Sequence, residues 1–201
     1  EGREGQEVTR TAALLLEVFL HEGRYHGEPE WPPSPARVFQ ALIAGAAHAS
    51  SLTENDERAL RWLESLPPPV VGSPRAVRGQ AVKIWVPNND LDAKGADPDA
   101  VSGIRTGKTF HPRLFDSAVP FVYAWDFDES GEAREQAEGV VALSNTLYQL
   151  GRGIDMGWAR GRVVEREELD DWLSGYHGQL HRPHPSAPST SGTPLDCPVW
   201  G

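Results

Sequence analysis

Residues 30–42 read EWPPSPARVFQAL, and this stretch contains the start of a helix. Ser34 is a good N-cap residue, because its hydroxyl can accept a hydrogen bond from an unpaired N–H of the first turn. Pro35 suits the first helical position, where its missing N–H costs nothing and its fixed φ angle is already helical. Pro32 and Pro33 keep the preceding chain extended. The stretch therefore predicts a helix that begins at Ser34 and whose direction is fixed where it leaves the loop.

The segments on either side of this helix predict an α+β fold. The predicted elements are a buried strand at 11–20, helices at 34–50 and 53–66, at least one strand within 70–89 that is clearest at 81–86, a strand at 119–127, a helix at 133–150, a strand at 154–165 and a short helix at 167–173. This order is that of the split βαβ, or ferredoxin-like, fold, which RNA recognition modules share. Element order alone does not determine function.

The 201 residues suit one main domain with extensions. We expect an N-terminal extension at 1–10, the ferredoxin-like domain at 11–173 with an insertion at about 88–118, and a linker or tail at 174–201. Residues 181–194 have almost no apolar side chains, which is typical of a linker. Because a short apolar segment, LDCPVWG, follows them, we expect the tail to lead to a further domain.

Composition restricts the function classes. The net charge of −10 argues against binding nucleic acid over a broad basic surface and leaves only a local basic site. The single cysteine, Cys197, excludes an intrachain disulfide and a cysteine-cluster zinc site, and the seven histidines show no metal-ligand spacing. We therefore expect no metal and no cofactor. Without an apolar run of about 20 residues or a secretory signal, the protein is expected to be cytoplasmic, with no membrane contact.

Positive charge is concentrated in two windows without acidic residues, 70–89 and 101–115. The basic and histidine side chains of the two windows are Arg75, Arg78, Lys83, Arg105, Lys108, His111 and Arg113. A flexible basic hairpin in the second window would suit a nucleic-acid backbone. The alternative is a solvated hairpin whose cations protect an edge strand from aggregation.

The sequence HEGRYHGE at 21–28 places an arginine and a tyrosine between two histidines. In one interpretation Arg24 contacts a phosphate, and Tyr25 or His26 stacks on a base. In a second, His26 is the general base of metal-independent RNA cleavage, with Tyr25 or Lys108 stabilising the transition state. The third interpretation is a polar loop without a binding role.

A glycine-rich turn lies in LYQLGRGIDMGWARGR at 147–162, with Arg152 inside it. Such a turn allows a phosphate to approach closely, or it is only a tight connection between helix and strand. Neither a P-loop nor a Rossmann fingerprint occurs. Six tryptophans fall in or beside predicted elements, and we expect them in the core or at interfaces rather than around a cofactor. They are Trp31, Trp62, Trp85, Trp125, Trp158 and Trp172.

Several of these motifs together resemble one known family. GRYHG at 23–27 followed by EWPPSPARVFQALIAG, RTGKTF before VPFVYAWDF, and LYQLGRG before a strand resemble the Csb-two proteins of type I-G (formerly I-U) CRISPR systems. In that family the N-terminal half is similar to the Cas-five subunit of Cascade, which has a ferredoxin-like body and a thumb hairpin and caps the crRNA at its 5′ handle. The C-terminal half resembles the Cas-six endoribonuclease.

The resemblance implies an RNA-binding Cascade subunit that caps the crRNA 5′ handle, contacts the neighbouring backbone and large subunits, and meets target DNA only indirectly. The residues expected to contact RNA are Arg24, Tyr25, His26, Arg37, Arg75, Arg78, Arg105, Lys108, His111, Arg113 and Arg152. No catalytic residue is expected in this segment, and crRNA processing is assigned to a half that follows it. The alternatives are a metal-independent endoribonuclease that uses Tyr25, His26 and Lys108 on pre-crRNA, and a scaffold without RNA contact.

Overall fold

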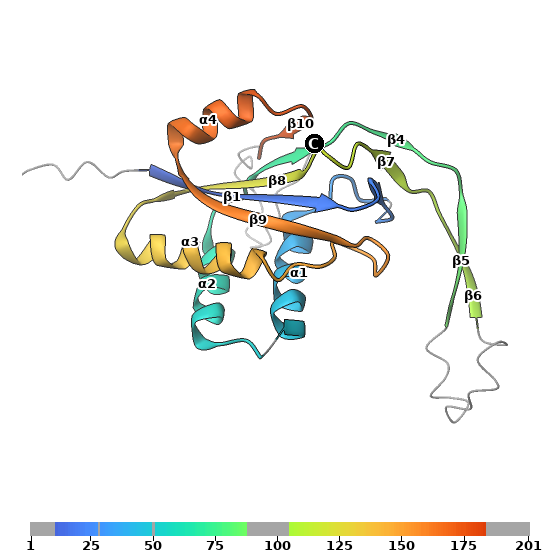
Figure 1. The fold of residues 1–201 in the computed structure, drawn as a ribbon, viewed down its shortest axis with the longest axis horizontal. Coiled ribbons are helices and arrows are strands. Elements are labelled where there is room, and N and C mark those ends of the chain that lie inside the picture. Colours follow the sequence, from blue (N-terminus) through green and yellow to red (C-terminus); the bar gives the residue numbers. More distant parts are fainter. Residues whose placement is uncertain (1–10, 28, 50, 88–104, 184–201) are drawn as a thin grey trace, which may run out of the picture.

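The computed structural model describes residues 11–27, 29–49, 51–87 and 105–183, and a five-stranded antiparallel sheet lies at its centre (Figure 1). Across the sheet the strands are β10 (Gln179–His181), β3 (Val70–Ser73), β8 (Phe121–Asp128), β1 (Thr11–Leu20) and β9 (Gly157–Glu165). The strands predicted at 11–20, 119–127 and 154–165 are confirmed as β1, β8 and β9. The described part of the chain therefore has the mixed α+β architecture expected from its sequence.

Helices cover both faces of this sheet, which explains the nearly continuous apolar run of β1. The helices α1 (Pro35–Ala49), α2 (Glu54–Ser65) and α3 (Gly131–Ser144) lie on one face, and α4 (Arg166–Ser174) lies on the other (Figure 1). Leu14, Leu16 and Val18 belong to the core under the first three helices. Ala13 and Leu15 belong to the core under α4, because successive strand residues point to opposite faces.

The helix starts follow their local sequence signals. Pro35 is the first residue of α1, as predicted. Thr53 caps α2 in a capping box: its side chain accepts from the N–H of Asp56, whose carboxylate accepts from the N–H of Thr53. Ser130 caps α3 without a reciprocal bond: its side chain accepts from the N–H of Ala133.

The helix predicted at 133–150 is shorter in the structure than in the prediction. The helix α3 stops at Ser144, and Leu147 and Leu150 reach the core from an irregular turn instead. Because Leu147 and Leu150 continue the apolar spacing of the helix, the predicted end at residue 150 was wrong. The side chains of Ser144 and Thr146 donate to the backbone carbonyls of Val141 and Leu143, an alternative to continued helix that these residue types favour.

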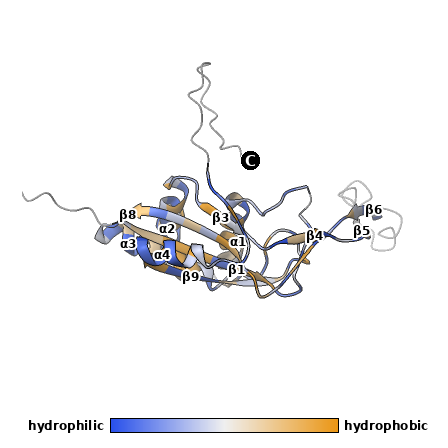
Figure 2. Ribbon diagram, turned by 90° about the horizontal axis from the view of Figure 1, so that it is seen from above, coloured by the Kyte–Doolittle hydropathy of each residue, from blue (hydrophilic) through white to orange (hydrophobic). Residues whose placement is uncertain are grey.

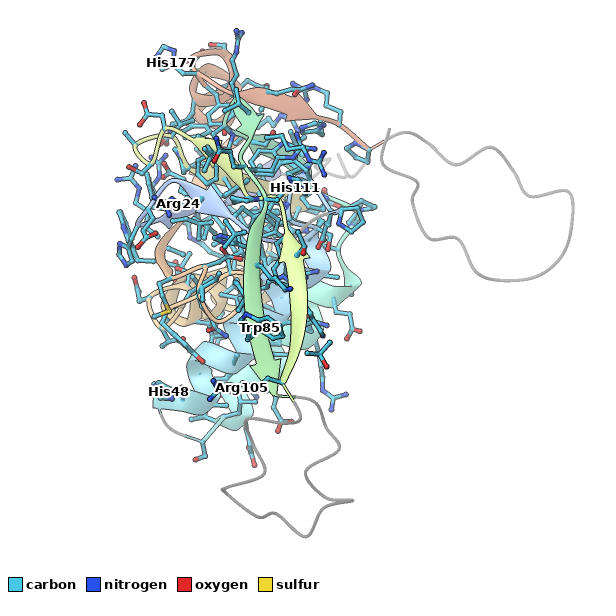
Figure 3. The ribbon with its side chains drawn as sticks, turned by 90° about the vertical axis from the view of Figure 1, so that its right-hand side faces the viewer. Arg24, His48, Trp85, Arg105, His111 and His177 are labelled. Carbon is cyan, nitrogen blue, oxygen red and sulfur yellow. The ribbon has the colours of Figure 1, made fainter. Side chains whose placement is uncertain are left out.

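The window at 70–89 contains three strands, and the strand of the main sheet is β3 rather than residues 81–86. A small sheet in the order β2-β7-β4 is formed by β2 (Arg24–Tyr25), β4 (Ala76–Arg78) and β7 (Arg113–Phe115). A separate hairpin is formed by β5 (Val82–Pro87) and β6 (Arg105–Phe110). We call this hairpin, β5 with β6, the arm. It extends from one end of the body (Figures 1 and 3).

Two predicted boundaries also change. The arm begins at Val82, upstream of the insertion expected at about 88–118, of which residues 88–104 lie outside the described residues. The folded body continues past residue 173, because β10 pairs with β3 at the edge of the main sheet. The extension at 1–10 and the tail from 184 onward also lie outside the described residues. No helix in the described ranges is long and apolar enough to span a membrane.

Candidate nucleic-acid interface

One face of the arm carries an aromatic ring between two cations. Trp85 pairs with Gly107 across the two strands, and Lys83 and Arg105 lie on the same face at neighbouring positions. The Trp85 side chain is 57% exposed, and the Lys83 ammonium lies 4.4 Å from its ring centroid. Gly107 leaves room for this pair, since a Cβ there would come within 2.5 Å of the Lys83 side chain. Figure 3 shows Trp85 and Arg105 along the arm.

The other face of the arm is tied to the body at its base. Phe110 is buried, and the guanidinium of Arg152 lies 4.0 Å from its ring centroid. Lys108 lies on the same face, two residues before Phe110, and is exposed. The structure therefore places Lys108 on the side of the arm that meets the glycine turn of Arg152.

The small sheet at the arm's base contains three more of the arginines expected to contact RNA, Arg24, Arg78 and Arg113. Arg24 is exposed and lies 3.7 Å from Glu22. Arg113 stands between Tyr25 and Arg78 in the register of β2, β7 and β4, with its guanidinium 5.9 Å from the Trp31 ring. Arg113 and Arg78 thus share one face of the small sheet where the arm meets the body, and Arg24, opposite Leu114, lies on its other face.

Two further predicted residues lie nearby. Arg75 is exposed in the turn between β3 and β4. His111 is half-buried, and its Nδ1 lies 3.4 Å from the carbonyl oxygen of Gly79 (Figure 3). Because a carbonyl only accepts, this contact requires the hydrogen of His111 on Nδ1.

A buried carboxylate, Asp155, joins the loop of His26 to the glycine turn. One carboxylate oxygen lies 2.6 Å from Nδ1 of His26, and both oxygens accept from the backbone N–H of His26 at 3.2 Å. The carboxylate also accepts from the N–H of Arg152, whose Nε donates to the carbonyl of His26 at 2.7 Å. These bonds hold two segments about 130 residues apart in the sequence as one unit.

Tyr25 is part of the core rather than of the surface. Its ring packs against Trp31 and Phe121, and its hydroxyl donates to Glu30. Burial, and next the neighbouring charge of Glu30, raise the pKa of the Tyr25 hydroxyl far above its ordinary value. The ring face is covered in this structure, which leaves no surface for base stacking, and the hydroxyl is committed to Glu30.

The Glu30 carboxylate binds the proline loop and the side chain of Arg37, which is another predicted RNA contact. Its carboxylate accepts from the N–H of Ser34 at 2.8 Å and from Nε of Arg37 at 2.6 Å. Burial alone would raise the pKa of Glu30, but the hydrogen bonds from Ser34 and Arg37 outweigh burial, and the pKa is lowered. Ser34 is the cap expected from the sequence, whereas the role of Glu30 is visible only in the fold.

The lowered pKa of Glu30 gives a prediction about pH. A carboxyl whose pKa is lower in the folded state stabilises the protein above its unfolded pKa of about 4.3, and this contribution is lost as the pH falls through the folded value. We expect E30Q to lower the free energy of unfolding by about 1–2 kcal/mol at pH 7. In urea unfolding, the difference between E30Q and the wild type should shrink as the pH falls below about 4. If E30Q and the wild type differ in unfolding free energy by the same amount at pH 7 and at low pH, the prediction is wrong.

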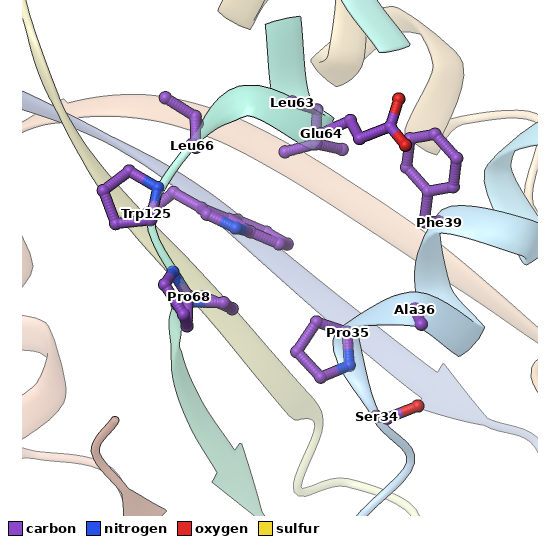
Figure 4. Close-up of a pocket in the computed structure, with 11 residues that line it drawn as sticks. Ser34, Pro35, Ala36, Phe39, Leu63, Glu64, Leu66, Pro68 and Trp125 are labelled. Atoms are coloured by element: carbon purple, nitrogen blue, oxygen red, sulfur yellow. The ribbon is translucent and has the colours of Figure 1, made fainter. Parts of the chain in front are cut away.

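No group of three metal-binding side chains occurs among the described residues. A groove of about 400 Å³ between α1 and α2 is lined mainly by prolines and by Phe39, Leu63, Leu66 and Trp125 (Figure 4). Such walls suit an apolar side chain rather than a phosphate. The arm, in contrast, combines exposed cations with an open aromatic ring on one element.

A family model and a solved structure match this chain. The model of a family described as "CRISPR-associated protein, GSU0054 family" matches residues 3–183. Among solved structures, the chain is similar to a CRISPR protein from Archaeoglobus fulgidus, with 15% identity, a TM-score of 0.34 and coverage of 77% of this chain and 62% of that chain. The chain thus spans less than two thirds of the length of that protein. The comparison with curated proteins gives no match.

Proposed function

The chain belongs to the GSU0054 family of CRISPR-associated proteins, and from this premise we propose that it is an RNA-binding subunit of a type I CRISPR Cascade complex. In this proposal it is of the Csb-two type of I-G systems and caps the crRNA at its 5′ handle. Its acidic remaining surface contacts the backbone and large subunits, and target DNA is met only through the complex.

The arm is the observation that carries this proposal. Its two strands contain Lys83, Arg105 and Lys108 and no acidic residue, although the whole chain has a net charge of −10. A protein of that charge repels RNA at long range, so binding requires a local basic element that reaches the phosphates. Trp85 adds an exposed ring on which a base can stack.

The arrangement of the sheet supports the view that the arm is a thumb on a ferredoxin-like body. Counted along the chain without the small sheets and β10, the strands β1, β3, β8 and β9 are the first to the fourth. They lie in the sheet in the order fourth, first, third, second, with helices between the first and second and between the third and fourth. This is the arrangement of the split βαβ fold. The arm is inserted between the second and third strands.

The 5′ handle would lie where the arm meets the body. Arg24, Arg113 and Arg152 provide the phosphate contacts there, with Arg75, Arg78 and His111 along β4 and the arm's base. Asp155 holds the His26 loop and Arg152 in place, so this part of the site is organised before RNA arrives. Arg37 contributes less in this proposal, because Glu30 already binds it.

A second candidate function, metal-independent cleavage of pre-crRNA, is favoured by the pairing of His26 with Asp155. With Nδ1 donating to the carboxylate, Nε2 is left as the atom that can exchange a proton, as a general base requires. Cleavage of pre-crRNA that persists in a metal chelator and is lost in H26Q would support it.

The test of the main proposal is crRNA crosslinking in the co-purified complex, mapped to residues of this chain. Crosslinks from the 5′ handle to the arm or to residues 23–37 are the expected result. If the chain is present in stoichiometric amount without crosslinks in either region, it is a scaffold and the proposal is wrong.

A further inference from the structure

The sheet face under α4 is covered over only half its length. Leu169 and Leu173 of α4 pack on Ala13, Leu15 and Val164, at the start of β1 and the end of β9. Figures 1 and 2 show α4 over the end of the sheet that lies away from the arm. Among the described residues, no helix lies over the other half of this face, at the end of β1 and the start of β9.

A stacked aromatic pair lies on the uncovered half. Phe19 and Trp158 are directly opposite each other on β1 and β9, with ring centroids 4.3 Å apart and planes within 9° of parallel. Trp158 is 43% exposed. β9 is the edge strand of the main sheet, so in the described part of the chain no further strand lies beside the Trp158 ring. A large aromatic surface is therefore open at the edge of the sheet.

Two arginines follow Trp158 on the same face of β9. Arg160 lies opposite Glu17 and donates to both of its carboxylate oxygens at 2.8 Å, which fixes the guanidinium 5.5 Å from the Phe19 ring centroid. Its side chain is still 55% exposed. Arg162 is two residues further along, and its guanidinium lies 3.7 Å from Glu17 and 3.5 Å from Glu168, while its Nε is buried without a hydrogen-bond partner among the described residues. The stacked rings are thus flanked by two guanidinium groups whose positions are fixed by carboxylates and whose outer edges remain exposed.

A groove of about 440 Å³ lies on the other side of Phe19. Its lining includes Phe19 and Pro120, and also Trp172 and Tyr176, which stack on each other. Asp171 and the C-terminal end of α4 also line the groove, and both disfavour a phosphate there. Glu17 and Arg160, which pair with each other, line the groove as well, so its aromatic lining suits a planar group rather than a phosphate.

We propose that this surface, Phe19 and Trp158 with Arg160 and Arg162, binds bases of single-stranded RNA, which stack on the outer face of Trp158 while their phosphates lie along the two arginines. Exposed aromatic rings on neighbouring sheet strands, flanked by arginine, are how sheet-based RNA modules hold bases. The site rests on the proposed function for the identity of its ligand. It lies on β1 and β9 and is distinct from the arm.

The test compares W158L with W158F in the full chain. Both keep an apolar side chain of similar exposure, but only phenylalanine retains a ring face. Binding is measured by fluorescence anisotropy with a labelled single-stranded RNA of about 12 nucleotides, a length within the site sizes of such proteins. We expect W158L to raise the dissociation constant about 5- to 50-fold and W158F to raise it about threefold or less. Thermal unfolding verifies that both variants fold.

Variants of the arm distinguish a failure of the Trp158 site from a failure of the proposed RNA-binding function. If W158L binds like the wild type while charge removal on the arm weakens binding, this site is wrong and the proposed function stands. An equal loss in W158L and W158F also overturns the site, because the ring then makes no difference. If the wild type shows no binding, both proposals fail together. In a parallel experiment, RNA carrying 5-iodouridine should crosslink to the peptide that contains Trp158.

Discussion

Replacement of Lys83, Arg105 and Lys108 together by glutamine is expected to weaken RNA binding by about 10- to 100-fold near physiological salt. These side chains are exposed on an element without acidic residues, so each can neutralise one phosphate and release its counterion. The slope of log K against log salt should become shallower by about two, which is the value for three contacts on a single strand. Anisotropy titrations at several salt concentrations measure both quantities.

The control must remove the same charge from a region away from the arm. Arg58 and Arg61 on α2 and Arg134 on α3 are exposed, and these helices lie at the other end of the body (Figure 1). The triple glutamine variant at these positions has the same net charge as the arm variant, which is more negative than the wild type by three. It should bind within about threefold of the wild type with an unchanged salt slope. Equal losses in the two triple variants would mean that total charge, and not the arm, determines binding.

The charge of the arm could be predicted from sequence, but its aromatic ring could not. Windows without acidic residues are visible by inspection, and they led to Arg105 and Lys108. Trp85 and Trp158 were expected in the core or at interfaces, because composition favours burial of tryptophan and exposure depends on which strand lies at an edge. Trp85 belongs to a hairpin outside the main sheet, and Trp158 belongs to the edge strand β9.

Local signals also explain which parts of the fold were predicted. The start of α1 at Pro35 and the capping box of Thr53 depend on neighbours within four residues, and both are confirmed. The choice of β3 rather than 81–86 for the main sheet depends on pairing with β8, about 50 residues away. Asp155 is the clearest omission in the site. It is one acidic residue in a glycine turn, and only the fold reveals that His26 is its partner.

The substitution D155A is expected to lower the free energy of unfolding by about 3 kcal/mol, because it leaves buried donors without an acceptor. The backbone N–H groups of His26 and Arg152 and the His26 ring lose their shared partner. For a domain of this size the melting temperature should fall by roughly 6–12 °C. The isosteric D155N keeps one acceptor oxygen and should lose about half as much.

The exposed Asp116 is the matched control, since its carboxylate also accepts a backbone N–H, that of Ala118. D116A should cost about 1 kcal/mol or less, because water can replace the lost acceptor at an exposed site. If D155A melts within 2 °C of D116A, as about 0.5 kcal/mol would give, then Asp155 does not hold the two loops together.

RNA binding separates the positioning role of Asp155 from a direct contact. D155A removes no cation and should leave the salt slope unchanged, yet it releases Arg152, which contacts Phe110 at the base of the arm. We therefore expect D155A to weaken RNA binding about 3- to 10-fold, at a temperature where the variant is still folded, with an unchanged salt slope. A slope shallower by about 0.7 in D155A would mean that Arg152 loses its phosphate contact, and a slope shallower by about two or more would mean that several cations of the region lose theirs. An unchanged affinity would mean that the arm positions its RNA contacts independently of the glycine turn.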